Sequence, residues 1–515
     1  MKGQKVNQLK WGVVITYGTL FLNIIISILY TPVMLRLLGP GEHGLYSTIS
    51  STMSWLSLLS LGVGASYIRF YSKYKVNNQE DYIASLNGLF LIFYSIVSTV
   101  TLVCGFVISQ NLHFVFADGI TASEYQTARI LAIIVTIDFA IGFPASLFNA
   151  IIKAHENFIQ VKLVNLMQCI TTPMITLPLL LMGYGSVAMV AVTTSVNLFA
   201  YCLNIFFCFK KLHTKFKFSG FEKGIVKNIA SFSLVVALNS VINMLNTSVD
   251  KMLLARFVGT VSVSVYTIGF SLYSYYSSFS SAIAGIMVPR INRIVNQNTE
   301  DKQMLRKELT EQFTKVGRIQ FYIQMLMCTG ILFFGKQFIF FWAGENYKNS
   351  YWVALLLCLA CTVPLIQSTG AEIQRAQNKH RFRTILYVIM TSFNVILTII
   401  LCQLYGEVGA AVGTAIAMIA IDVIVMNIYY HKKLYIDIIY FWKNILKISK
   451  GLILPVAVGI IITVFIRINS VFELAIYIAI YSLIYCISIW FLSMSNDEKN
   501  IIFGKIMKNS KKKES

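Results

Sequence analysis

Four polar side chains recur at helical spacing within an otherwise apolar stretch. Asn239, Asn243, Asn246 and Asp250 are separated by four, three and four residues, so an α-helix would bring them onto one face. Amide and carboxylate groups that face lipid are unfavourable, so this polar stripe should face protein or a water-filled cavity. An amide both donates and accepts hydrogen bonds, as a sugar hydroxyl does. We expect the stripe to line a substrate path; hydrogen bonding to a neighbouring helix is the structural alternative.

Other charged residues lie inside apolar runs, where an ionisable group is by default a functional candidate. Asp138 and Asp422 are central in their runs, and with Asp250 they are candidates for binding a coupling proton or sodium ion. Each carboxylate has a helix–helix hydrogen bond as its alternative. Three basic residues join the candidate cavity set, although snorkelling or membrane orientation would also explain them: Arg129, Lys251 and Arg290.

The composition places these residues in a membrane protein. Of the 515 residues, 56% are hydrophobic and only 13% are charged, and many apolar runs exceed 18 residues. The sequence has no Walker A motif, no nucleophile elbow and no histidine pair at metal-ligand spacing. We therefore expect a secondary transporter without a cofactor or a metal site, and not an enzyme.

The expected fold is an all-α polytopic bundle of about fourteen transmembrane helices. Most of the 43 lysines and arginines fall in loops on one side of these helices, which places both termini in the cytoplasm. The net charge of +21 is therefore mainly a topology signal, and we expect no nucleic-acid partner. The predicted spans are residues 11–35, 44–67, 85–109, 127–150, 158–181, 186–209, 229–255, 262–288, 318–341, 351–373, 384–404, 408–430, 451–467 and 472–494.

The chain also contains an internal duplication. Arg36, Gly39 and Tyr46 recur 220 residues later as Arg256, Gly259 and Tyr266, and the same offset places Asn243 on Asn23. Asn23 is therefore added to the cavity candidates. Six crossings per copy make the copies parallel repeats. The expected domains are an N-terminal six-helix bundle, a C-terminal six-helix bundle, two further helices and a frayed basic tail near anionic lipid, at residues 1–218, 219–435, 436–495 and 496–515.

Three motifs and the span pattern carry a resemblance to a known family. They are LRLLGPGEHGLY after the opening span, VDKMLLARFVGTVSVSVY in the middle, RAQNKHRF after span ten, and fourteen spans arranged as six, six and two. In this order the chain resembles, over essentially its whole length, the polysaccharide repeat-unit flippases of the multidrug/oligosaccharidyl-lipid/polysaccharide exporter superfamily. The drug-extruding branch typically has twelve spans, so the extra pair favours lipid-linked sugars.

The resemblance implies two bundles around a cavity that opens alternately to each side of a bacterial inner membrane. It implies a cargo of undecaprenyl-diphosphate-linked oligosaccharide, moved to the outer leaflet for O-antigen, capsule or exopolysaccharide synthesis. Implied partners are membrane lipids, a polysaccharide polymerase and a chain-length regulator. Alternatives within transport are a cation-coupled drug antiporter and a peptidoglycan-precursor flippase. The alternative of another class is a membrane-embedded polymerase or acyltransferase.

Overall fold

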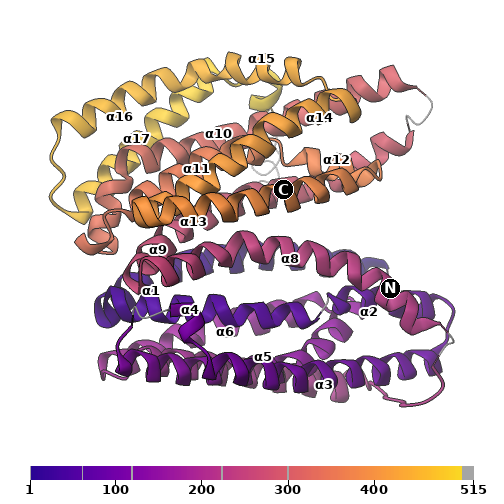
Figure 1. Cartoon of the computed structure of the whole chain (residues 1–515). Helices are drawn as coiled ribbons and strands as arrows, with labels where there is room; N and C mark the ends of the chain where they lie inside the picture. The colour runs from indigo at the N-terminus through magenta and orange to yellow at the C-terminus, as the bar shows by residue number, and fades with distance from the viewer. Residues whose placement is uncertain (1, 61, 117–119, 222–223, 298–300, 501–515) are drawn as a thin grey trace, which may run out of the picture. The chain divides into compact units, whose positions relative to one another are not determined.

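A computed structural model describes residues 2–60, 62–116, 120–221, 224–297 and 301–500 (Figure 1). Helices and short connections account for these residues, and the described ranges contain no strand. Ten of the described helices are long and apolar enough to cross a membrane. The expectation of an all-α polytopic fold is therefore confirmed.

The number of spans stays a prediction. Residues 21–76 and 381–433 are each a single apolar helical stretch, and each includes two of the predicted spans. In both stretches the helix breaks at a glycine with a positive φ, Gly39 (72°) and Gly406 (58°), which is the point where the sequence predicts a turn between spans. Glycine adopts this left-handed region without the steric cost of a Cβ atom.

Contacts between Cα atoms divide the chain into two compact units. The first contains residues 1–267 and 402–407, and the second contains residues 268–401 and 408–515. Helices of the first unit are α1 (Lys2–Ser54), η1 (Trp55–Ser60), α2 (Val63–Val76), α3 (Glu80–Gln110), α4 (His113–Phe116), α5 (Ala122–Ala154), α6 (Phe158–Leu181), α7 (Gly185–Lys210) and α8 (Ile225–Phe257). Helix α9 (Thr260–Gln297) begins in the first unit and continues in the second.

The second unit continues to the end of the described chain. Its remaining helices are α10 (Lys302–Trp342), η2 (Glu345–Tyr347), α11 (Ser350–Ile366), α12 (Thr369–Ala376), α13 (His380–Met418), the π-helix η3 (Ile419–Val425), α14 (Met426–Lys433), α15 (Ile438–Ile448), η4 (Ser449–Leu452), α16 (Ile453–Phe465) and α17 (Val471–Leu492). Several of these helices begin where the sequence supplies a capping side chain. The carboxylates of Asp301 and Asp437, for example, accept backbone hydrogen bonds at the starts of α10 and α15.

Unusual backbone conformations recur at matching positions of the two repeats. Besides Gly39 and Gly259, three pairs of residues with positive φ lie 221 or 222 positions apart. These pairs are Gly185 (63°) with Gly406 (58°), Glu156 (60°) with Asn378 (59°), and His213 (47°) with Tyr435 (58°). Left-handed backbone is uncommon for residues other than glycine. Its recurrence within two residues of the 220-residue offset read from the sequence shows that the two copies end their helices in the same way.

The first unit packs around α5. Helices α3, α6 and α7 all contact α5, and α6 also packs on α1 and α7 (Figure 1). Aromatic side chains fill the space between α2, α3 and α5, including Tyr67, Phe90 and Phe148. Burial of these large rings stabilises the packing of α2, α3 and α5 against one another.

Helix α8 lies with the first unit, because it packs on α1, α2, α4 and η1. The sequence instead assigns residues 219–435 to the second bundle, since the repeat begins again there. The compact units follow packing and the predicted boundaries follow the duplication, so the two divisions differ at this helix. Whether the two repeats end at residues 218 and 435 stays a prediction.

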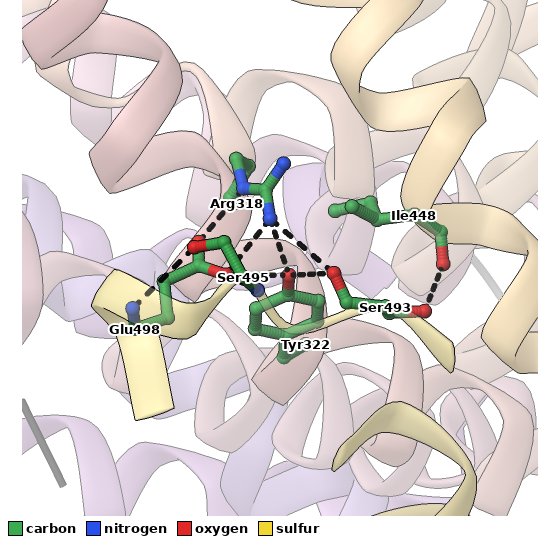
Figure 2. Close-up of polar contacts among 6 residues, drawn as sticks. All are labelled: Arg318, Tyr322, Ile448, Ser493, Ser495 and Glu498. Carbon is green, nitrogen blue, oxygen red and sulfur yellow. Dashed lines mark hydrogen bonds and ion pairs between the residues drawn. The ribbon is translucent and has the colours of Figure 1, made fainter. Parts of the chain in front are cut away.

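Helix α10 is longer than the span predicted at residues 318–341, because residues 302–317 are helical and continuous with that span. One expectation about the second unit needs correction. The tail from Asn496, expected to be frayed, is helical over residues 496–500, and the rest of it lies outside the described residues. The reason is visible in Figure 2: Arg318 of α10 donates to the carboxylate of Glu498, which is buried.

Candidate functional site

The polar stripe lies on one uninterrupted helix, as its spacing predicts. Helix α8 runs from Ile225 to Phe257 and includes all four residues. Asp250 is 3% exposed, and its Oδ2 accepts a hydrogen bond of 2.6 Å from the Tyr266 hydroxyl in the first turns of α9. Asn246 and Lys251 are half-buried. The side chains of Asn239 and Asn243 lie outside the described residues, so their place on the substrate path stays a prediction.

The start of α9, which supplies Tyr266, packs closely on the matching part of the first repeat. The Nδ1 atom of His43 lies 2.7 Å from the Ser264 Oγ, and both side chains are buried. Gly44 faces the Thr260 backbone so closely that any side chain there would collide with the Thr260 carbonyl. The openings of the two repeats therefore meet here, and the Asp250–Tyr266 hydrogen bond ties α8 to the same place.

Asp138 is the end of a chain of amides inside the first unit. The Asn197 side chain on α7 donates to Asp138 Oδ2 on α5 at 2.9 Å, and it accepts from Gln168 on α6 at 2.9 Å. The other carboxylate oxygen of Asp138 is buried without a hydrogen-bond partner. This network joins three helices in an apolar bundle. The Tyr201 hydroxyl interacts with the same carboxylate, so Asp138 is surrounded by polar side chains in a setting that is typical of an ion or substrate path.

Asp422 belongs to a second polar network, in the second unit. It lies in the π-helical segment η3 and is 8% exposed. The Tyr387 hydroxyl on α13 donates to Asp422 Oδ1 at 2.7 Å, and Arg383, one turn earlier, donates to that hydroxyl at 2.9 Å. A π-helical turn widens the helix and is frequent at functional sites. The arginine thus reaches the carboxylate through a shared tyrosine.

Three predicted residues are exposed on their units: Asn23 on α1, Arg129 on α5 and Arg290 on α9. Asn23 accepts a hydrogen bond from the Cys169 thiol at 2.9 Å. Within each unit, no hydrogen bond or ion pair of the described residues joins Arg129 to Asp138 or Asp250, or Arg290 to Asp422. The carboxylates and the exposed arginines are therefore separate features of the molecule.

Sequence reasoning missed the partners of these carboxylates. Asn197, Gln168 and Tyr387 each lie in an apolar span, and a lone polar residue there was the available signal. Arg383 lies at the cytoplasmic end of a predicted span, where membrane orientation alone explains a basic residue. Its spacing of four from Tyr387, however, puts both side chains on one helical face.

Comparisons with known proteins agree with this architecture. Residues 9–295 match the protein family described as "Polysaccharide biosynthesis protein". A Shigella flexneri protein named "Putative O-antigen transporter" is 21% identical over 395 residues, which is 75% of this chain and 88% of that protein.

Two solved structures share the fold. The lipid II flippase MurJ in an inward closed conformation has a TM-score of 0.69 at 15% identity, covering 96% of this chain and 99% of that chain. An inward-facing multidrug resistance MATE family transporter of the MOP superfamily has a TM-score of 0.67 at 12% identity, covering 81% of this chain and 98% of that chain. At these identities the likeness concerns the fold alone.

Proposed function

From the premise that this chain belongs to the family of polysaccharide biosynthesis proteins, we propose that it flips undecaprenyl-diphosphate-linked oligosaccharide repeat units from the cytoplasmic to the outer leaflet. The chain is a membrane transporter with the fold of known flippases, and it is not an enzyme. The repeat unit would serve a surface polysaccharide such as O-antigen or capsule, as the name of the Shigella flexneri relative suggests.

Physical chemistry supports a protein-assisted route for such a cargo. A diphosphate and a set of sugar hydroxyls lose their hydration in hydrocarbon, so the lipid cannot carry them across unaided. The observation that carries the proposal is the amide chain ending at Asp138, held inside an apolar bundle. Amides that alternate between donor and acceptor are suited to hydroxyl groups, and intramembrane carboxylates typically mark substrate or ion paths.

We extend the proposal to coupling, partners and location. Asp138, Asp250 and Asp422 are the candidates for binding a coupling proton or sodium ion. A polysaccharide polymerase and a chain-length regulator would act on the flipped unit. The protein would lie in a bacterial inner membrane with both termini in the cytoplasm, as the distribution of lysine and arginine predicts.

Deletion of the gene tests this function. We expect surface polysaccharide to be lost while complete lipid-linked repeat units accumulate, measured by mass spectrometry of extracted lipids. Incomplete units would favour an acyltransferase or another enzyme of assembly. Complete units that reach the outer face but stay unpolymerised would favour a polymerase. Loss of drug resistance with normal surface polysaccharide would favour the drug antiporter, and loss of viability with lipid II accumulation would favour the peptidoglycan-precursor flippase.

A further inference from the structure

The first unit contains a cavity of about 550 Å³ between α2, α3, α5, α6 and α7. It lies toward the end of the bundle where α5 finishes at Ala154 and α7 finishes at Lys210. That end carries the basic loops and is therefore the predicted cytoplasmic end. The volume is in the range of about 300–1,000 Å³ that is usual for small-molecule sites.

The lining of this cavity is rich in side-chain amides. Four carboxamides from three helices contribute to it: Asn149, Asn165, Gln168 and Asn204. Tyr94, Ser146 and Tyr201 add hydroxyl groups. Such a wall presents donors and acceptors in similar number, which matches a polyhydroxylated ligand better than an apolar or a purely ionic one.

Two of these amides have an unmet acceptor. Asn204 is only 4% exposed, yet its side-chain oxygen has no hydrogen-bond partner, and the same holds for the buried side-chain oxygen of Asn149. A buried acceptor without a donor is unfavourable, so native proteins rarely leave one without a reason. If either carboxamide turned its oxygen toward the cavity, a bound hydroxyl would supply the missing donor.

The charge of the lining is positive. Lys153, an exposed residue at the end of α5, is among the lining residues, and no aspartate or glutamate of the described chain is. An ammonium group beside amides would attract one negatively charged group of a ligand while the amides bind its hydroxyls.

We propose that this cavity, which we call the loading cavity, binds sugars of the lipid-linked repeat unit from the cytoplasmic side, with Lys153 facing one anionic group. This inference rests on the proposed function and adds a cargo site to it. The anionic group is either a phosphate of the lipid carrier or the carboxylate of an acidic sugar, since both have the same chemistry toward an ammonium group.

Photo-crosslinking tests whether cargo enters the loading cavity. A photoreactive amino acid at Ser146 in the full-length protein should crosslink to radiolabelled lipid-linked repeat units in membranes. Ser195 is a matched control: like Ser146 it is exposed and bonds to its own helix backbone, but it is not among the lining residues. Equal labelling at both positions, or no labelling at Ser146, would overturn the inference.

Binding to purified full-length protein separates the groups involved. We expect Asn149→Leu to weaken binding of the released oligosaccharide at least tenfold, measured by calorimetry. Lys153→Gln should weaken binding of one anionic probe about tenfold, and Lys153→Arg should restore it. If that probe is undecaprenyl diphosphate, the group is the carrier phosphate; if it is the released oligosaccharide, the group is a sugar carboxylate.

Control variants keep this outcome separate from the proposed function. Ala65 is exposed and lines the cavity, so Ala65→Trp fills space without deleting a polar contact. It should block both binding and surface polysaccharide with an unchanged melting temperature. Normal binding by folded Asn149→Leu, Lys153→Gln and Ala65→Trp proteins would contradict the role of the loading cavity and leave the proposed function intact. An unaltered surface polysaccharide in the deletion strain would instead sink the proposed function.

Discussion

Arg318 holds Glu498 by two parallel hydrogen bonds of 2.7 and 2.8 Å (Figure 2). The side chains are 13% and 7% exposed, so this ion pair is largely removed from water. Tyr322 donates to the same carboxylate at 3.2 Å, and Glu498 also completes a capping interaction with Ser495. The residues after α17 are thereby fastened to α10, and the last two helices are fixed to the second unit.

Glu498→Gln should lower the melting temperature of the purified protein. The change leaves a buried guanidinium without its counter-charge, and loss of one partner of a buried pair typically costs about 3–5 kcal/mol. Asp497→Asn is the matched control, because Asp497 is the exposed neighbour and should tolerate the change. Equal melting temperatures for the wild type and Glu498→Gln would show that the pair does not stabilise the fold.

The same pair predicts a pH dependence. Burial is the largest single influence on the pKa of Glu498 and raises it, but the hydrogen bonds from Arg318 and Ser495 and the positive charge of Arg318 together outweigh burial and lower the pKa of the carboxyl below its usual value. A lowered pKa means that the stabilisation is fully present above about pH 5 and is lost as the pH falls through the folded-state pKa. The gap in melting temperature between wild type and Glu498→Gln should therefore shrink in acid. A gap that widened in acid would contradict this sign.

The polar stripe on α8 gives a prediction about transport. Asn243→Ala and Asp250→Ala should each abolish flipping while membrane abundance stays near that of the wild type, measured by immunoblot beside surface polysaccharide. Loss of abundance together with activity would favour a structural role, and full activity in both variants would remove the stripe from the substrate path.

Asp250 allows a finer distinction, because its bond to Tyr266 is defined. Asp250→Asn keeps an acceptor for the tyrosine hydroxyl but cannot bind a proton, whereas Tyr266→Phe removes the bond and keeps the carboxylate. If Asp250 binds a coupling ion, Asp250→Asn should abolish flipping and Tyr266→Phe should largely preserve it. The reverse pattern would mean that Asp250 serves to position α9.

Predicted topology can be tested with reporter fusions. Fusions after Lys217 and Lys302 should report cytoplasm, and fusions after Asp118 and Lys348 should report the outside, because lysine and arginine cluster in the first pair of loops. The Asp118 and Lys217 fusions are separated by three predicted spans. A common side for these two would invalidate the span count.

Features that depend on nearby residues can be predicted from the sequence, whereas features that depend on contacts between distant residues cannot. Helix α8, its stripe and the duplication follow from local spacing and a constant offset, and the structure has the same helix and the same recurring left-handed turns. Contacts between residues far apart in the sequence cannot be predicted in this way. The sequence identifies Tyr266 only as part of the repeat, because nothing in its neighbourhood indicates a bond to Asp250.

The Arg318–Glu498 pair shows the same limit. Arg318 begins a predicted span, and Glu498 lies in a tail dominated by basic residues, so membrane orientation and fraying were the natural expectations. Their 180-residue separation is closed only by the packing of α17 on α10. The polar partners of Asp138 and Asp422 are determined in the same way, by tertiary contact.

Whether the protein flips its cargo is tested most directly by measuring which face of the membrane the cargo occupies. Spheroplasts of a deletion strain and of a complemented strain are exposed to a membrane-impermeant reagent that oxidises sugar diols, and the modified fraction of lipid-linked repeat units is measured. A flippase predicts complete units that are protected without the protein and become accessible when it is restored. Units equally accessible in both strains would contradict the account.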